Sequence, residues 1–267
     1  MLECRRRESE SSKLVTRQQM LQKIRRALGR QGEDKPRMPG DLAALPDLGA
    51  VLPPISPQTL IGTFEEELRK VGGCTYRATS RSEIARILQQ ILKIGGHSGP
   101  DRSEGIVLSR NPLLARLEIK EIIGSLGLHA WVWPGEAGLV LAAEDERAYR
   151  ERCFSADAGL TGVDFALAES GSLVLTSRTE GSQLSSLAPP IHIALYLHSQ
   201  LVGSLEEVLA GLPLPGSTAG DADGRSVVFV TGTSRTADIE QILIRGVHGP
   251  REVHAILVDG EIGQENQ

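Results

Sequence analysis

The chain has 267 residues and a net charge of −5, and aromatic side chains make up only 3% of it. This length allows one large domain or two small ones with a well-buried core. The acidic balance argues against a nucleic-acid-binding protein, which normally carries a basic stripe. Because aromatic residues are scarce, Leu, Ile, Val and Ala must build the core, which suits buried strands between helices.

Targeting signals and cysteine clusters are both missing from the sequence. No apolar run approaches the roughly 20 residues that span a bilayer, and the N-terminus lacks the apolar core of a signal peptide. We therefore expect a cytoplasmic protein with no membrane span. Cys4, Cys74 and Cys153 lie far apart, which predicts neither a disulfide framework nor a metal site. Three thiols cannot supply the four ligands of an iron–sulfur cluster, so we expect this chain to hold no cofactor.

The first part of the chain, residues 1–57, is expected to lie outside the main domain. Residues 1–13 are polar and charged and predict a disordered start. Thr16 and Gln19 have the spacing of a capping box, which predicts a short basic helix with an apolar face of Leu21, Ile24 and Leu28. Residues 30–57 carry six prolines and predict a linker. Such a helix can lie on a membrane or on a partner protein, but its short length and narrow apolar face favour packing on its own chain or on a sister subunit in a homo-oligomer.

Helices and strands alternate in the first half of the region 58–262, which we expect to be one domain. Short connections between them predict βαβ units and a largely parallel sheet, hence an α/β fold. The expected elements are a helix with Leu60, Ile61, Phe64 and Leu68, a strand at Cys74–Thr79, a helix opened by Ser80 and Glu83 with Ile84, Ile87, Leu88 and Ile91 on one face, a strand at Ile106–Leu108, a helix at Pro112–Ser125 and a strand at Ala130–Trp133.

The second half of this region starts with a different pattern. Two short apolar segments, 165–168 and 172–176, flank Glu169-Ser-Gly171 and predict a strand pair rather than another βα unit. Alternation then resumes. The expected elements are a strand at Ile191–Leu197, a helix capped by Ser204 with Glu207, a strand at Val227–Val230, a helix starting near Thr236 and a strand at Val253–Val258.

The segment from Val230 to Glu240 predicts an anion site. A buried strand ends in a Gly- and hydroxyl-rich turn that opens into a helix, where free backbone N–H groups and the helix dipole attract an anion. The carboxyl end of a strand is also the usual ligand edge of an open parallel sheet. An ordinary Ser/Thr helix cap with a solvated Arg235 is the alternative. The candidate ligand-binding residues here are Gly232, Thr233, Ser234, Arg235, Thr236 and Asp238.

Two further segments of the chain carry candidate residues. Glu169 ends an apolar strand beside Gly171, where a carboxylate could act as a nucleophile or base; a loop glutamate in a tight turn is the alternative. His248 and Gly249 lie in a Gly/Pro turn after the expected C-terminal helix, and we count both among the anion-site candidates. The sequence contains neither G-x-G-x-x-G nor a P-loop motif, which argues against a dehydrogenase or a P-loop NTPase.

Five motifs follow one another along the chain, namely Thr161–Leu175, Glu180–Ser182, Pro189–Ile193, Gly232–Glu240 and Gly246–Pro250. Taken together and in this order, they resemble the LUD-domain, lactate-utilisation protein C family. The resemblance is close over residues 155–260, and 20–28 is similar to the family's N-terminal helix. Ala168–Gly171 only loosely resembles the segment that carries the nucleophilic glutamate of some CoA-transferases.

The resemblance implies a NagB/RpiA/CoA-transferase-like fold and a part in the oxidation of L-lactate to pyruvate. It implies iron–sulfur proteins as partners, which would hold the clusters that this chain lacks. The resulting expectation is an accessory or ligand-binding subunit that takes a small anionic ligand and binds no nucleic acid. The alternative is a stand-alone enzyme of the CoA-transferase or sugar-phosphate-isomerase type that uses Glu169.

Overall fold

The computed structural model divides the chain into two compact units, Met1–Leu52 and Pro53–Gln267. In the first unit the helix α1 (Arg17–Ala27) confirms the helix expected there, and Met20, Leu21 and Ile24 are exposed on it; Thr16, Leu28 and the linker lie outside the described residues. The structure describes residues 17–27, 54–92, 105–135, 142–212, 226–237, 243–246, 248–259 and 262.

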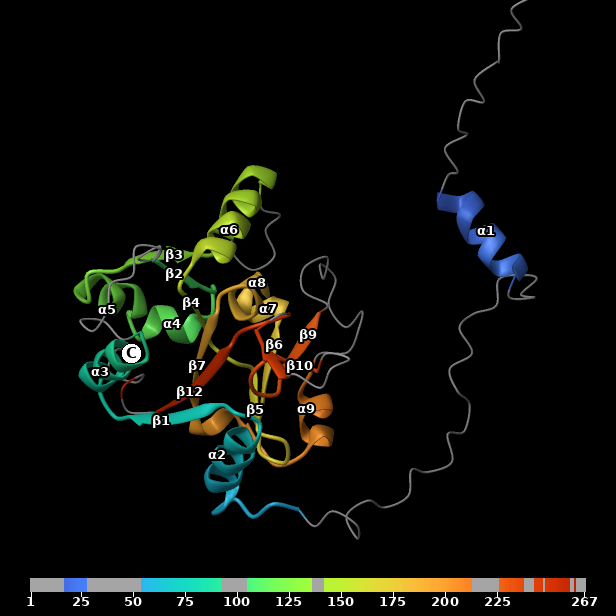
Figure 1. Ribbon diagram of the computed structural model, residues 1–267. Helices are drawn as coiled ribbons and strands as arrows, with labels where there is room; N and C mark the ends of the chain where they lie inside the picture. The colour runs from blue at the N-terminus through green and yellow to red at the C-terminus, as the bar shows by residue number, and fades with distance from the viewer. Residues whose placement is uncertain are drawn as a thin grey trace, which may run out of the picture. The chain divides into compact units, whose positions relative to one another are not determined.

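A six-stranded parallel sheet forms the centre of the second unit (Figure 1). Its strand order is β1-β12-β7-β4-β2-β3, and every neighbouring pair is parallel. The α/β fold with a largely parallel sheet is therefore confirmed. The strands are β1 (Cys74–Ala78), β2 (Gly105–Leu108), β3 (His129–Val132), β4 (Ala158–Thr161), β7 (Ile191–Leu197) and β12 (Glu252–Val258).

Alternate residues of each central strand enter different cores, because successive side chains of a strand point to opposite faces. In β7, Ile193 and Leu195 pack into one apolar cluster, whereas Ala194 and Tyr196 pack into another. All four are fully buried. A sheet covered on both faces explains why these strands are almost continuously apolar.

Three helices cover the first face of the sheet. They are α3 (Arg81–Ile91), α4 (Pro112–Arg116) and α5 (Ile119–Ser125). Ser80 caps α3 by accepting a hydrogen bond from the backbone N–H of Glu83 at 3.2 Å, and the whole predicted apolar face of α3 is buried. The single helix expected over 112–125 is wrong. Glu118 takes a left-handed conformation (φ 53°), which ends one helix and starts the next.

A second, four-stranded sheet and the helix α2 (Leu60–Lys70) cover part of the other face. Phe64 of α2 contacts Tyr196 of β7 edge to face, with ring centroids 5.2 Å apart. The helix α2 and the central sheet therefore share one core. The predicted strand pair is confirmed, since β5 and β6 are antiparallel. The strand order is β8-β5-β6-β9, for β5 (Phe165–Leu167), β6 (Ser172–Thr176), β8 (Leu201–Val202) and β9 (Val227–Val230).

The outer side of this second sheet packs on α9 (Leu205–Gly211) through Leu167, Val174 and Val208. Ser204 caps α9 as predicted, accepting from the backbone N–H of Glu207 at 3.3 Å. Leu197 is followed by a short 3-10 helix, η2 (His198–Gln200), which leads into β8.

The elements that the sequence analysis did not foresee include β4 and the helix α6 (Ala143–Ser155). Only Tyr149 and Cys153 of α6 are buried, so α6 lacks the apolar stripe that reveals a helix in a sequence. These two side chains pack with Val107 of β2, on the face opposite Ile106 and Leu108. The connection from β3 to β4 therefore crosses the sheet on the other side from the connection between β2 and β3.

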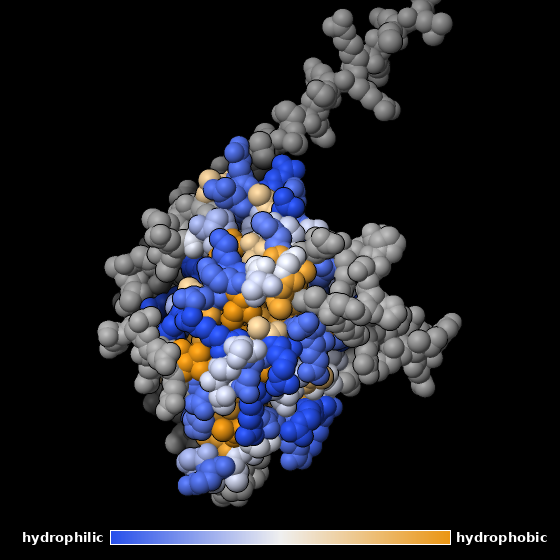
Figure 2. Space-filling view, turned by 90° about the vertical axis from the view of Figure 1, so that its left-hand side faces the viewer, coloured by the Kyte–Doolittle hydropathy of each residue, from blue (hydrophilic) through white to orange (hydrophobic). Residues whose placement is uncertain are grey.

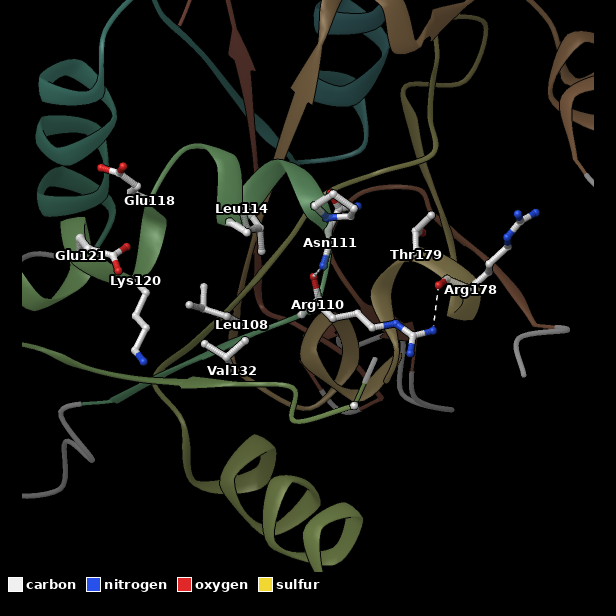
Figure 3. A pocket seen from close by; sticks show the side chains of 14 residues that line it. Leu108, Arg110, Asn111, Leu114, Glu118, Lys120, Glu121, Val132, Arg178 and Thr179 are labelled. Atoms are coloured by element: carbon white, nitrogen blue, oxygen red, sulfur yellow. Dashed lines mark hydrogen bonds between the residues drawn. The ribbon is translucent and has the colours of Figure 1, made fainter. Parts of the chain in front are cut away.

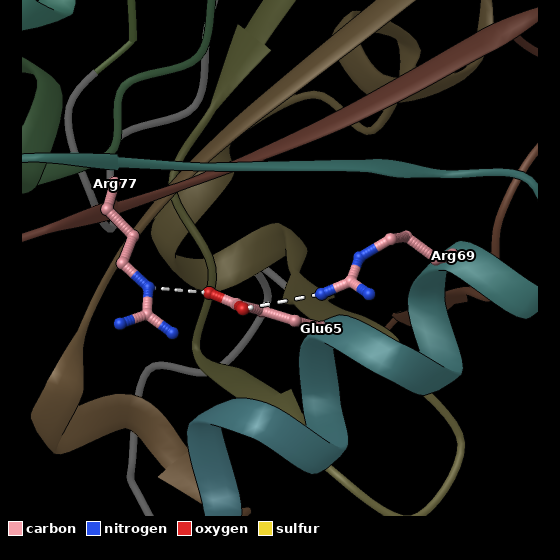
Figure 4. A network of polar contacts seen from close by, with 3 residues as sticks. All are labelled: Glu65, Arg69 and Arg77. Atoms are coloured by element: carbon pink, nitrogen blue, oxygen red, sulfur yellow. Dashed lines mark hydrogen bonds and ion pairs between the residues drawn. The ribbon is translucent and has the colours of Figure 1, made fainter.

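The face of the molecule shown in Figure 2 is mostly hydrophilic, with apolar residues visible between hydrophilic ones. One polar network ties α2 to β1. Glu65 lies between Arg77 and Arg69, accepting from Arg77 Nε at 2.7 Å and contacting Arg69 at 3.5 Å (Figure 4). Such exposed ion pairs contribute little stability each.

Among the described residues, no helix is long and apolar enough to cross a membrane.

Candidate ligand-binding site

A cavity of about 690 Å³ lies at the carboxyl end of β2. The chain runs from β2 outward to β3 and then returns to β4 on the other side of β2. The carboxyl ends of β2 and β4 therefore form the topological switch point of the sheet. Ligands of open α/β sheets bind at such a point, because the connections leave a crevice there.

Charged side chains surround an apolar centre in this cavity. Figure 3 shows Lys120 and two acidic residues of the α4–α5 segment on one side, and Arg110 and Arg178 on the other. A mostly apolar lining with a few placed polar groups is typical of small-molecule sites of this volume. The apolar lining includes Leu108, Leu114 and Val132, and the polar residues of the inner wall are Ser109, Asn111 and Thr179.

Directly behind this wall lies Glu180, a carboxylate that is 1% exposed. Its Oε2 accepts a hydrogen bond from Ser109 Oγ at 2.5 Å and another from the backbone N–H of Gly162 at 3.2 Å. Its Oε1 accepts from Asn111 Nδ2. Each of these partners follows the carboxyl end of β2 or β4, so Glu180 joins the two strands at the switch point.

Burial raises the pKa of the Glu180 carboxyl to about 7, although the hydrogen bonds from Ser109 and Asn111 oppose this change. The negative charge of Asp164 raises the pKa further. Asp164 itself accepts from the backbone N–H of Thr176 at 2.7 Å and from Thr179 Oγ1 at 2.9 Å, and burial raises its pKa as well. Carboxyl groups with a shifted pKa are found more often at functional sites than elsewhere, so their position beside a cavity makes this region a candidate site.

The local chain holds Glu180 in place from several sides. It ends the short helix α7 (Ser177–Glu180), and Arg110 donates to the carbonyl oxygens of Ser177 at 3.2 Å and Arg178 at 2.8 Å. Gly181 follows with φ 77°. A Cβ at Gly181 would come within 2.6 Å of the ring of Trp133, so a glycine is needed both for the turn and for this contact.

The predicted anion turn lies at the opposite edge of the parallel sheet. The backbone N–H of Ser234 donates to Pro250 O at 3.0 Å, and that of Thr233 donates to Val71 O at 3.4 Å. Val71 and Pro250 precede β1 and β12, which places the turn at the amino ends of these strands. The expectation of a carboxyl-edge position is wrong because β9, the strand before the turn, pairs with β6 in the second sheet.

The helix expected to start near Thr236 is also wrong over the described backbone. Two short antiparallel strands, β10 (Arg235–Ala237) and β11 (Leu243–Arg245), take its place. Their pairing occupies backbone groups that a helix N-terminus would leave free. The main argument for an anion at this turn is therefore lost. The side chains of Arg235 and Thr236, and Asp238 altogether, lie outside the described residues, so these candidates stay untested.

The structure brings the two glycine-rich motifs together. The backbone N–H of Gly246 donates to Ser234 O at 3.0 Å, and a Cβ at Gly249 would lie 3.3 Å from Ser234 Cβ. Gly232 also needs its glycine, because its φ is 77° and a Cβ would lie 2.3 Å from Val71 O. His248 is exposed in the same turn. These contacts account for the glycines of both motifs as packing requirements.

Glu169 lies in the turn between β5 and β6, and it does not line the cavity at the switch point. Its Oε1 accepts from the backbone N–H of Leu205, the first residue of α9, at 2.8 Å. A carboxylate at the start of a helix satisfies a free N–H group and interacts well with the dipole. The contact is structural, and it gives no support to a stand-alone enzyme that uses Glu169.

Among the described residues, Glu180, Ser109, Asn111 and Gly162 are site residues that the sequence analysis did not identify. Glu180 appeared there only within a family motif. The signal that could have found it is the pairing of Ser109-x-Asn111 after one apolar strand with Gly162 after another. That pairing becomes meaningful only once β4 is recognised as the neighbour of β2.

The fold and the cavity define an α/β protein with a candidate site at the switch point of a parallel sheet. The family model described as the LUD domain matches residues 61–258. The chain therefore belongs to the LUD domain family, and the family resemblance of its motifs is confirmed.

Curated relatives include several proteins named lactate utilization protein C. Those of Deinococcus radiodurans and Halalkalibacterium halodurans are 36% and 38% identical over 39% and 41% of this chain, and the match spans 47% of the length of each. That of Geobacillus thermodenitrificans is 28% identical over 92% of this chain and 97% of its own length. A crystal structure of a DUF162 family protein from Deinococcus radiodurans is 20% identical, covering 77% of this chain and 99% of its own, with a TM-score of 0.45.

Proposed function

We propose that this chain takes part in the utilisation of L-lactate as an accessory, ligand-binding subunit that works with iron–sulfur partner proteins. Its ligand is a small carboxylate held in the cavity at the switch point. The observation that carries the proposal is the position of this cavity, which is lined by three cationic side chains and by the buried polar residues Ser109 and Asn111. The redox chemistry belongs to the partners.

The cavity offers the contacts that a carboxylate needs. Arg110, Lys120 and Arg178 supply positive charge, and guanidinium groups match a carboxylate with paired N–H donors. Ser109 and Thr179 add hydroxyl groups. Glu118 is held by an ion pair with Arg81, which reduces its repulsion of an anion.

The names of the relatives support the pathway. The Geobacillus relative corresponds to this chain over nearly the whole length of both, so the correspondence extends beyond one motif. This supports a role for the present chain in the same process.

Growth on lactate tests the role in the organism. Deletion of the gene should abolish or strongly slow growth on L-lactate as the sole carbon source, and it should leave growth on pyruvate unchanged. Expression of the full chain in the deletion strain should restore growth on L-lactate. Normal growth of the deletion strain on L-lactate would contradict the proposed pathway.

Affinity capture tests the partners. The full chain, tagged and produced at its native level in cells growing on L-lactate, should retain iron–sulfur proteins with the absorption of their clusters. The control is the same affinity capture from a strain that lacks the gene and produces the tag alone. Recovery of the chain without any iron–sulfur protein would remove the accessory role.

Calorimetric titration tests the cavity with pyruvate and L-lactate as probes. Arg178 is exposed at the cavity, so Arg178→Gln should keep the fold and weaken binding roughly five- to tenfold, as expected for the loss of a charge-assisted contact. The matched control is Arg147→Gln, an exposed arginine of α6 paired with Glu151. Equal affinities of the two variants would exclude the cavity as the binding site.

A further inference from the structure

The hydroxyl group of Ser109 stands between the Glu180 carboxyl and the cavity. Ser109 lines the cavity, and its Oγ lies 2.5 Å from Glu180 Oε2. The same Oγ accepts a hydrogen bond from the backbone N–H of Asn111 at 3.3 Å. A hydroxyl group has one hydrogen to donate and two positions to accept, so the state of Glu180 determines where the hydrogen of Ser109 points.

The two protonation states of Glu180 require opposite orientations of this hydroxyl. An ionised carboxylate only accepts, so Ser109 must donate its hydrogen to Glu180 and has none for a ligand. A protonated Glu180 donates to Ser109 Oγ, which fills the second acceptor position beside Asn111. The hydrogen of Ser109 is then released toward the cavity, where it can bind an anion.

We propose that the binding of a small carboxylate in the cavity is coupled to the uptake of one proton by Glu180, through the reorientation of the Ser109 hydroxyl. The proton comes from solvent and forms an O–H bond on Oε2, while Ser109 keeps its own hydrogen and no other bond changes. The inference rests on the proposed function, because it takes the cavity to be a site for a carboxylate.

The groups around Glu180 favour such coupling. Asp164 adds negative charge, Tyr149 of α6 stays neutral because burial raises its pKa, and Arg110 presents its backbone N–H to the Glu180 carbonyl at 3.2 Å. Arg178, on α7 with Glu180, is exposed to solvent. With a pKa of about 7, Glu180 populates both states near neutral pH, so a ligand can shift the balance between them.

Titration of the wild-type chain at several pH values tests the coupling. At pH 7.5, calorimetry with pyruvate and with L-lactate, in two buffers of different ionisation enthalpy, should report the uptake of roughly half a proton or more per ligand bound. The Kd should be constant below about pH 6 and rise roughly tenfold in all between about pH 6 and 9, because the ionised Glu180 withholds a hydrogen bond whose loss costs about tenfold in affinity.

The outcomes separate this inference from the proposed function. Binding without proton uptake, or with one Kd from pH 6 to 9, overturns the coupling and leaves the cavity as a carboxylate site. The absence of binding by either anion overturns both. The two-buffer measurement needs no variant, so the result stands even where a substitution impairs folding.

Two variants then locate the coupling. Glu180→Gln has no group to titrate and should give a Kd that is independent of pH, whereas the control Glu169→Gln should keep the tenfold rise. Ser109→Ala should bind roughly tenfold more weakly at pH 6, as expected for a lost hydrogen bond to a charged ligand. A pH dependence that persists in folded Glu180→Gln assigns the proton to another group and overturns the proposal.

Discussion

The carboxyl edge and the amino edge of the parallel sheet use similar residues in different ways. At the carboxyl edge, Ser109, Asn111 and Gly162 direct polar groups at one buried carboxylate and leave a cavity beside it. At the amino edge, the turn at Ser234 and the turn before Pro250 bond to each other through backbone groups. Hydroxyl and glycine residues are abundant at both, and at the carboxyl edge the buried carboxyl group of Glu180 lies beside a cavity.

The difference shows that position in the sheet decides what a glycine-rich turn can do. The backbone N–H groups of the amino-edge turns donate to neighbouring loops and strands, and these hydrogen bonds stabilise the fold. The carboxyl-edge turns lie where the connections diverge, so their side chains face a space that the chain does not fill. The following tests compare the two edges, from the largest expected effect to the smallest.

Gly162→Ala should cause the largest loss of stability. A Cβ there would lie 2.2 to 2.4 Å from the Asn111 amide, which cannot withdraw because it binds Glu180 and the backbone N–H of Leu113. We expect the free energy of unfolding, measured with urea, to fall by about 3 kcal/mol. In the control Gly62→Ala, a Cβ meets no described atom within 4 Å, and the helix should gain about 0.5 kcal/mol. Equal stabilities would contradict the packing of the carboxyl edge.

The pH dependence of stability should reveal Glu180. Its pKa rises from 4.5 to about 7 on folding, so the folded chain binds more protons than the unfolded chain between these values. Stability must therefore fall as the pH increases through this window. Relative to Glu180→Gln, the wild type should lose about 3 kcal/mol of unfolding free energy between pH 4.5 and 8. Parallel curves for the two proteins would show that Glu180 titrates normally.

Glu169→Ala should have a moderate effect that is confined to stability. The substitution removes the hydrogen bond to the start of α9, and the expected loss is about 1 kcal/mol, as for other helix caps. The control Glu206→Ala, in the first turn of the same helix, should lose about 0.3 kcal/mol through the dipole alone. Pyruvate binding should be unchanged in both, and a large loss of binding in Glu169→Ala would make this carboxylate functional after all.

Arg235→Ala should have the smallest effect. Because a hairpin replaces the expected helix at this turn, we expect the affinity for pyruvate or sulfate to change less than about twofold and the stability by less than about 0.5 kcal/mol. Titration of the variant beside Arg178→Gln compares the two edges directly. If Arg235→Ala were the more damaging substitution, the ligand site would lie at the amino edge.

Sequence patterns predicted the elements that bury an apolar stripe. The four apolar residues of α3 and the strand pair β5–β6 were found because their periodicity follows from burial on one face. The helix α6 was missed because only two of its residues are buried. The break at Glu118 depends on one left-handed residue that is not a glycine, which no local pattern indicates.

The candidate site was harder to predict than the fold, since its residues meet only through sheet order. Ser109, Gly162 and Glu180 are far apart in the sequence, and they meet because β2 and β4 are neighbours. The turn at Gly232 has every local sign of an anion site, but its strand belongs to the second sheet. Strand order is a long-range property that a single sequence does not reveal.

The only two tryptophans of the chain are Trp131, within β3, and Trp133, directly after it. Trp133 contacts Tyr149 edge to face at 5.0 Å and would touch any side chain placed at Gly181. The Arg152 guanidinium lies 5.0 Å above the ring of Trp131. Trp133 therefore emits from a position against the turn that follows Glu180, so its fluorescence can report the occupancy of the neighbouring cavity in the unlabelled chain.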